Sequence, residues 1–145
     1  MSPLSGGSSD TEPGKILLNT LWRVAVDAAS CAHAPYSGLR VGAAVRGTSL
    51  IGYPGCNMES ASYGLSLCAE RSAINHALLS GVLPGQMSGI LIYTPGEERL
   101  LAPCGACRQV MAEYFEPGSL VVSCNDSADY RRWTLEELIP DAFTL

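Results

Sequence analysis

The amino-acid sequence predicts an α/β fold, a three-layer α/β/α sandwich around a mixed five-stranded sheet. The first observation is the order of the segments: helix, hairpin, helix, strand, helix, strand and a final strand. Strand–helix–strand alternation is typical of sheets covered by helices, and it predicts that this sheet is largely parallel. The second observation is a hydrophobic share of 47% over 145 residues, which favours one domain with a single core.

The first half of the chain is expected to form a helix and a hairpin. Apolar side chains recur every three or four residues over 15–34, which predicts a helix that Pro35 stops. Residues 39–47 and 49–55 have the composition of two short strands joined by a turn near Gly47.

The second half alternates helices and strands. Two nearly continuous apolar runs are typical of strands buried on both faces of a sheet. Thr134 and Glu137 form a capping-box pattern, which predicts a short last helix. In chain order, we expect a helix over 67–79, a strand over 89–94, a helix over 104–115, a strand over 119–124 and a fifth strand over 130–133.

Residues 1–14 are rich in Ser, Gly and Pro and are expected to be a flexible leader to a single domain over 15–145. The leader has neither a basic start nor an apolar run of signal-peptide length. No segment of the sequence is long and apolar enough to span a membrane. We therefore expect a cytoplasmic protein.

The charge balance argues against a polynucleotide partner. The formal net charge is −5, and Lys15 is the one lysine in the sequence. A nucleic-acid-binding surface normally presents a basic face. The adjacent pair Arg131 and Arg132 is more typical of a solvated corner, so a small-molecule ligand is favoured over nucleic acid.

Three of the six cysteines are placed where they can bind a metal. Cys68 opens one expected helix, and Cys104 and Cys107 lie in the first turn of another. Residues at i and i+3 share a helix face, and a helix N-terminus stabilises a thiolate. Three thiolates from two converging helix ends would hold Zn²⁺ and leave one coordination position open, as catalytic zinc sites require.

Glu70 is the candidate proton carrier at this site. Side chains two positions apart in a regular helix point about 200° away from each other. Cys68 and Glu70 therefore share a site only if Cys68 lies at the helix boundary. A glutamate near the open position could take a proton from water and return it to a substrate nitrogen.

Other interpretations of these residues remain open. A C-x-x-C pair can be a redox dithiol, and Cys56 or Cys124 could complete a closed structural zinc site. Cys31 and Cys124 are expected to be small buried side chains. His33 and His76 are possible ligands by type, but His76 lies too far along its helix to join Cys68 at one ion.

The sequence resembles the small homotetrameric cytidine deaminases of the three-cysteine zinc type. C-A-E followed about 35 residues later by P-C-x-x-C is the signature of zinc deaminases of nucleobases. "APYSGLRVGAAV", "GCNMESASYGLSLCAERSAI", "PCGACRQVMAE" and "LIPDAF" resemble successive blocks of that family in the family's order, over residues 34–143. The resemblance implies the cytidine deaminase-like fold and hydrolytic conversion of cytidine, and usually 2′-deoxycytidine, to uridine and ammonia.

The resemblance also implies the site residues. Glu70 matches the proton shuttle, which also bonds the pyrimidine N3, and the backbone at Ala69 is expected to contact the base. Phe143 resembles an aromatic residue that packs on the substrate from a neighbouring subunit. Cys68, Cys104 and Cys107 match the zinc ligands, and Asn57 and Glu59 match the pair that holds the ribose 3′-hydroxyl. Without the flanking blocks, an ordinary turn would be the preferred interpretation of Asn57 and Glu59.

Two residues decide how closely the chemistry follows the family. Arg71 is expected to donate to a thiolate and withdraw charge from a centre with formal charge −1, with a surface arginine as the alternative. At Leu39 the family usually has phenylalanine, so an apolar wall is kept but aromatic stacking of roughly 0.5–1.5 kcal/mol is lost.

The expected function is that of a homotetrameric zinc hydrolase in pyrimidine salvage, acting on free cytosine nucleosides. One alternative is a deaminase of a modified cytosine nucleoside, such as an antibiotic of the blasticidin type or a biosynthetic intermediate. A polynucleotide deaminase disagrees with the acidic charge balance, and those enzymes commonly have histidine at the position of Cys68. A structural-zinc interaction module is the non-enzymatic alternative.

Overall fold

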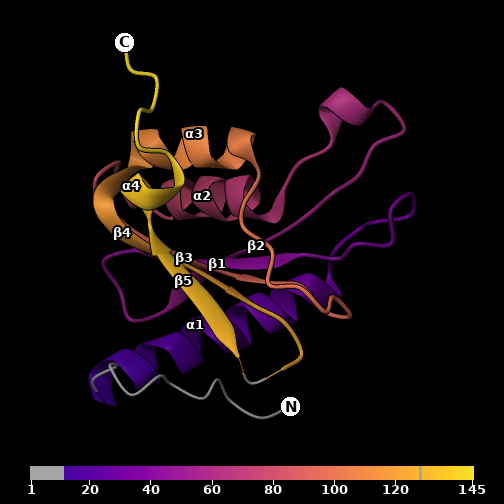
Figure 1. The fold of residues 1–145 in the computed structure, drawn as a ribbon, viewed down its shortest axis with the longest axis horizontal. Coiled ribbons are helices and arrows are strands. Elements are labelled where there is room, and N and C mark those ends of the chain that lie inside the picture. The colour runs from indigo at the N-terminus through magenta and orange to yellow at the C-terminus, as the bar shows by residue number, and fades with distance from the viewer. Residues whose placement is uncertain (1–11, 128) are drawn as a thin grey trace.

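A computed structural model describes residues 12–127 and 129–145. Within them, one five-stranded sheet has the strand order β2-β1-β3-β4-β5 and is covered by helices on both faces (Figure 1). In chain order the elements are α1 (Glu12–Ser30), β1 (Gly42–Arg46), β2 (Gly52–Cys56), the 3₁₀ helix η1 (Tyr63–Leu65), α2 (Ala69–Leu79), β3 (Met87–Tyr93), α3 (Gly105–Tyr114), β4 (Phe115–Cys124), β5 (Tyr130–Thr134) and α4 (Leu135–Leu138).

The predicted mixed five-stranded sheet is confirmed, but the expectation that it is largely parallel is wrong. Among the strands of the described residues, β3 and β4 form the one parallel pair, and β1–β2, β1–β3 and β4–β5 are antiparallel. α2 connects β2 to β3, which run in the same direction, but β1 lies between them and runs the opposite way. Strand–helix–strand alternation therefore overestimates parallel pairing when a hairpin strand inserts into the middle of the sheet.

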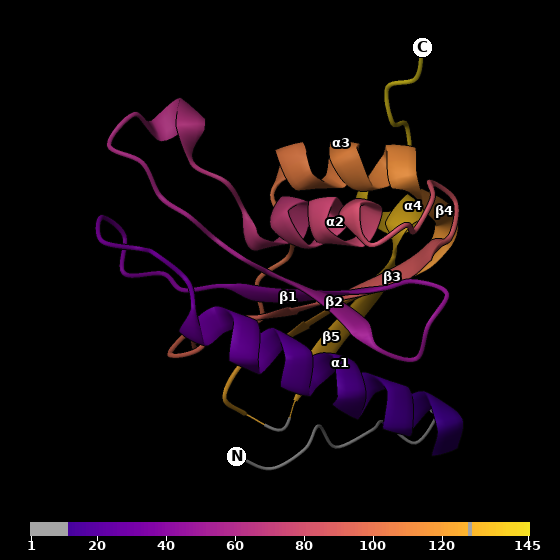
Figure 2. The ribbon, with the colours of Figure 1, turned by 180° about the vertical axis from the view of Figure 1, so that it is seen from behind.

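The helices divide between the two faces of the sheet. Figures 1 and 2 show α1 on one face and α2, α3 and α4 on the other. α1 buries Leu21 and Ala25 against Leu91 and its neighbours in the sheet. A second apolar cluster joins α2 and α3 to the other face of β1, β3 and β4, and it includes Ala73, Ile74, Ile90, Ile92, Met111 and Val121.

Two glycines allow the helices to approach the sheet closely. A Cβ atom at Gly42 would lie 1.9 Å from the Ala25 carbonyl oxygen of α1. A Cβ atom at Gly55 would lie 2.2 Å from the Ala73 nitrogen and 2.4 Å from the Ala69 oxygen of α2. α2 therefore rests directly on the backbone of β2, and the height of its first turn above the sheet is fixed.

The element boundaries differ modestly from those expected. α1 begins at Glu12, three residues before the expected start, and ends at Ser30, where a turn follows. Residues 1–11 of the predicted leader lie outside the described part of the chain, and its flexibility stays a prediction. The predicted cap of α4 is present, because the Thr134 N–H donates to the Glu137 carboxylate at 2.8 Å.

The exposure of the cysteines and the contacts of His76 test two further expectations. Cys124 is buried, as predicted, but the prediction for Cys31 is wrong: it is exposed in the turn immediately after α1. His76 Nδ1 lies 3.0 Å from the Pro54 carbonyl oxygen, and its ring stands edge-on to Tyr53, so it packs away from the three cysteines. Among the described helices, none combines the length and the apolar character needed to cross a bilayer.

Candidate active site

Cys68 lies at the boundary of α2, as the predicted pairing with Glu70 requires. It is the N-cap residue, with extended backbone angles (φ −75°, ψ 152°), and the helix begins at Ala69. Because the backbone is not yet helical at Cys68, its side chain and that of Glu70 both reach the same pocket. The expected departure from helical geometry is confirmed.

The three predicted cysteines converge. Cys104 is the N-cap of α3, and Cys107 lies in the first turn of that helix. The three sulfur atoms lie within 4.8 Å of one another, and Cys68 Sγ and Cys104 Sγ are 3.9 Å apart. Tetrahedral zinc with Zn–S bonds of about 2.3 Å needs sulfur atoms roughly 3.8 Å apart. The thiol cluster therefore matches a three-cysteine zinc centre.

The thiol cluster is polarised toward the thiolate form at Cys68. A hydrogen bond from the Cys107 thiol, supported by Arg71 and Cys104, lowers the pKa of Cys68 to about 5. The same hydrogen bond and burial raise the pKa of Cys107, which keeps the shared proton. A metal ion must displace this proton, so zinc binding at this centre is coupled to proton release.

Arg71 faces the thiol cluster from the first turn of α2. Its Nη2 lies 3.4 Å from Cys68 Sγ, and this hydrogen bond raises the pKa of the guanidinium above its ordinary value. Arg71 Nε is buried and has no hydrogen-bond partner among the described residues. The contact between Arg71 Nη2 and Cys68 Sγ favours the charge-withdrawal interpretation over that of a solvated surface arginine.

Glu70 is a buried carboxyl group beside a thiolate. Only 6% of its surface is exposed, and burial, reinforced by the negative charge of Cys68, raises its pKa to about 7. A carboxyl group with a pKa near neutrality can both accept and return a proton at ordinary pH.

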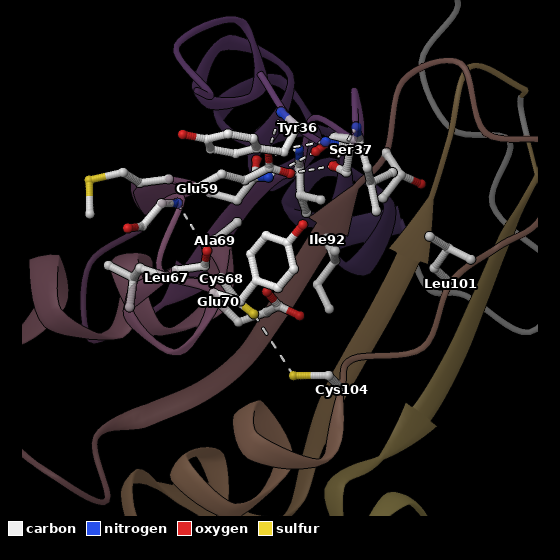
Figure 3. A pocket seen from close by; sticks show the side chains of 18 of the residues that line it. Tyr36, Ser37, Glu59, Leu67, Cys68, Ala69, Glu70, Ile92, Leu101 and Cys104 are labelled. Carbon is white, nitrogen blue, oxygen red and sulfur yellow. Dashed lines mark hydrogen bonds between the residues drawn. The ribbon is translucent and has the colours of Figure 1, made fainter. Parts of the chain in front are cut away.

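The thiol cluster and Glu70 open onto a pocket of about 550 Å³ (Figure 3). The predicted residues Leu39, Asn57, Glu59, Ala69 and Glu70 line it together with Cys68 and Cys104, whereas Cys107 is buried behind them. Phe143 does not line it; its side chain is exposed in the C-terminal segment, where its carbonyl oxygen accepts a hydrogen bond from Gln109 Nε2 at 3.0 Å.

Asn57 and Glu59 support the loop that forms one wall of the pocket. Asn57 Nδ2 donates to the Leu39 carbonyl, and Asn57 Oδ1 accepts from the Val41 N–H, both at 2.8 Å. The Glu59 carboxylate accepts from the Ser37 hydroxyl and from the Tyr36 and Ser37 N–H groups at 2.9 and 3.2 Å. These hydrogen bonds lower the pKa of Glu59, chiefly through Ser37.

The pocket has further walls that sequence reasoning missed. Tyr36 and Tyr63 contribute aromatic surface, and Thr94, Leu101 and Ala102 complete the side next to Cys104. Tyr36 and Tyr63 stand within the quoted family blocks and could have been considered from them. The segment carrying Leu101 and Ala102 lies outside every block and has no pattern that predicts a pocket.

Comparison with known proteins agrees with this geometry. Residues 17–124, which include all three cysteines, match the cytidine and deoxycytidylate deaminase zinc-binding region. The chain belongs to the cytidine deaminase family. A cytidine deaminase from Halalkalibacterium halodurans is 40% identical over 124 residues, which cover 86% of this chain and 92% of the relative.

Solved cytidine deaminases share the fold. The crystal structure of the cytidine deaminase from Burkholderia pseudomallei matches with a TM-score of 0.80 and 44% identity, over 85% of this chain and 96% of that one. The cytidine deaminase from Mycobacterium tuberculosis matches with a TM-score of 0.74 and 34% identity, over 94% of this chain and 100% of that one. The chain thus has a zinc-binding deaminase domain, and its three-cysteine cluster is compatible with the zinc site of that domain.

Proposed function

We propose that this protein catalyses the zinc-dependent hydrolytic deamination of cytidine and 2′-deoxycytidine to uridine and 2′-deoxyuridine, with release of ammonia. The observation that carries the proposal is the meeting of a three-thiol cluster and a buried carboxyl group, Glu70, at one pocket. A volume of about 550 Å³ falls in the range of small-molecule sites.

Glu70 would carry the protons of the reaction. When bound by Cys68, Cys104 and Cys107, zinc supplies a Lewis acid that makes water nucleophilic near neutral pH. The Glu70 carboxylate accepts a proton from the attacking water and delivers it to N3 of the cytosine ring. The water oxygen bonds to C4, and Glu70 takes the proton that remains on this oxygen and transfers it to the amino group. The bond from C4 to the amino nitrogen then breaks, ammonia leaves and the C4 carbonyl forms.

Asn57 and Glu59 retain capacity for the ribose 3′-hydroxyl. A carboxylate offers about four acceptor positions, and three at Glu59 are used within the chain. Asn57 uses one of its two N–H groups and one acceptor position. One hydroxyl group can therefore donate to Glu59 and accept from Asn57, while the Ala69 backbone faces the base.

The remaining expectations follow the family resemblance. We propose a homotetramer in the cytoplasm that serves pyrimidine salvage, in which Phe143 of one subunit packs on the substrate of its neighbour. Exposure of Phe143 away from the pocket of its own chain leaves the ring available for such a contact. A single chain with full activity would contradict this part of the proposal.

One observation favours a second candidate, a deaminase of a modified cytosine nucleoside. Leu39 stands in the pocket wall where the family usually has phenylalanine, so position 39 offers no ring for the pyrimidine to stack on. Comparing kcat/KM for cytidine, 2′-deoxycytidine and blasticidin S, with zinc measured in the same samples, separates the two candidates. Faster turnover of a single-stranded oligonucleotide than of cytidine would exclude both.

The variant Glu70→Gln separates the enzyme from a structural-zinc protein. It keeps the size and burial of the side chain but cannot carry a proton. We expect the variant to keep its zinc and its melting temperature while kcat falls by roughly two to four orders of magnitude. Glu113→Gln, an exposed change on α3, is the matched control. Unchanged turnover in Glu70→Gln would contradict the proposed role of Glu70 as proton carrier.

A further inference from the structure

The pocket wall next to Cys104 belongs to a segment without regular structure. Residues 95–103 connect the end of β3 to α3 and contribute Leu101 and Ala102 to the pocket. In Figure 3, Leu101 lies across the pocket from Leu67. Apart from the turn at Pro95 and Gly96, no main-chain hydrogen bond joins residues 95–103 to another main-chain group within 12–127 and 129–145. Their position must therefore come from side chains.

Two side chains of the turn between β4 and β5, those of Asn125 and Asp126, make hydrogen bonds that hold this segment. The Asp126 carboxylate accepts from the Gly96 N–H through Oδ2 at 2.7 Å and from the Tyr93 hydroxyl through Oδ1 at 2.5 Å. Asn125 Nδ2 donates to the carbonyl oxygens of Glu97 and Glu98 at 2.8 and 3.3 Å. Residues 96–98 are thus held from a turn about 30 positions further along the chain.

Asn125 uses all of its hydrogen-bonding capacity. Its Oδ1 accepts from the Ser127 N–H at 3.0 Å and from the Ser127 hydroxyl at 2.7 Å, in addition to the two bonds that Nδ2 donates. The side chain is 6% exposed. A buried amide with every group paired has one orientation, so it transmits the position of the turn to residues 97 and 98.

The zinc ligand at the end of the segment has a separate support. Arg108 Nε donates to the Pro103 carbonyl oxygen at 2.8 Å, and Arg108 Nη1 donates to the Leu138 carbonyl oxygen at 3.0 Å. Pro103 directly precedes Cys104, so Arg108 on α3 fixes the ligand end. The Asn125 and Asp126 bonds act at the opposite end, on residues 96–98.

We propose that Asn125 and Asp126 are positioning residues that set the affinity for substrate by holding residues 96–98, and through them the pocket wall at Leu101 and Ala102. The proposal rests on the proposed function for its substrate. Loosening this wall weakens ground-state and transition-state binding alike, because Leu101 and Ala102 are apolar and carry no proton. Such a loss raises KM and leaves kcat unchanged.

The primary test is Asp126→Ala, because Asp126 is exposed and its loss leaves no cavity in the core. We expect KM for cytidine to rise by roughly tenfold, kcat to stay within about twofold, and zinc content to be unchanged. Asp126→Asn can accept from Gly96 and donate to the Tyr93 oxygen, so it should restore most of the affinity. Asp129→Ala, an exposed change in the same turn, is the control.

Amide hydrogen exchange separates this inference from the proposed function. In Asp126→Ala, the peptide covering residues 95–103 should exchange faster, while the peptide covering α2 should not. Asn125→Ala should act in the same direction and more strongly on both KM and exchange. Unchanged exchange in Asp126→Ala would overturn the proposal even if wild-type protein does not convert cytidine. Faster exchange with equal losses of kcat and zinc would also overturn it, because the turn would then support the metal site.

Discussion

The Asn57 side chain holds the main chain of Leu39: its Nδ2 donates to the Leu39 carbonyl oxygen at 2.8 Å. A residue that matches a ribose ligand therefore also fixes the position at which this chain departs from the usual family residue. Loss of Asn57 should disturb the base-facing wall as well as the sugar contact, and these two effects can be separated with a substrate that lacks the 3′-hydroxyl.

We predict that Asn57→Ala raises KM for 2′,3′-dideoxycytidine as well as for cytidine. If Asn57 acted only on the 3′-hydroxyl, the variant and the wild type would have equal KM values for the dideoxy substrate. Steady-state kinetics with both nucleosides check this. The structural contribution follows from the two 2.8 Å bonds to Leu39 and Val41, which alanine cannot make.

We predict that Leu39→Phe lowers KM for cytidine by roughly two- to tenfold, because a ring in the wall adds about 0.5–1.5 kcal/mol of aromatic interaction. Leu39→Met keeps the volume without a ring and is the matched control. If both variants behave as wild type, the pocket has adapted elsewhere to the absence of the ring. A higher KM in Leu39→Phe would favour a bulkier natural substrate.

We predict that Arg71→Ala keeps some turnover but binds zinc roughly 10- to 100-fold more weakly, because Nη2 no longer donates to Cys68 Sγ. Competition with a chromogenic chelator measures the zinc affinity. Arg23→Ala, an exposed arginine change on α1 at the opposite face of the sheet, controls for net charge. Equal zinc affinity in the two variants would contradict the charge-withdrawal role.

We predict that Asp126 makes stability depend on pH in the acid range. Hydrogen bonds from Tyr93 and from the Gly96 N–H lower the pKa of Asp126. A group with a lowered folded-state pKa stabilises the fold above its unfolded pKa of about 4, and this contribution is lost as pH falls through the folded value. The wild type should therefore melt above Asp126→Asn at pH 7, with the difference closing below about pH 4. A constant difference down to pH 2 would exclude this linkage.

Local patterns predicted most elements because each carries its own signal. The apolar period of α1, the continuous runs of β3 and β4, and the cap at Thr134 and Glu137 depend on neighbours in sequence. The predicted hairpin gives β1 antiparallel to β2, but the position of β1 between β2 and β3, antiparallel to both, depends on how distant strands assemble and was not predicted. Exposure of Cys31 was missed because the helix ends one residue before it.

The candidate site divides in the same way. Cys68, Glu70, Cys104 and Cys107 have spacings that imply a metal and a proton carrier, and the convergence of two helix ends follows from them. The wall at Leu101 and Ala102 depends on bonds from Asn125 to residues that lie 27 and 28 positions away. No local pattern encodes such a contact, so it required the structure.

The close contact of Gly55 with α2 has a consequence for how this protein can change. The start of α2, with Cys68 and Glu70, forms the floor of the pocket. Because a methyl group at position 55 would collide with Ala69 and Ala73, a substitution at this position of β2 cannot be used to reshape that floor. The loops over 36–41 and 95–103 are attached away from that contact. The Asn57 side chain and a main-chain bond from the Asn57 N–H to the Val41 carbonyl hold the first, and the Asn125 side chain holds the second. New substrate preferences, natural or engineered, should therefore arise by exchanging these two loops over an unaltered catalytic floor.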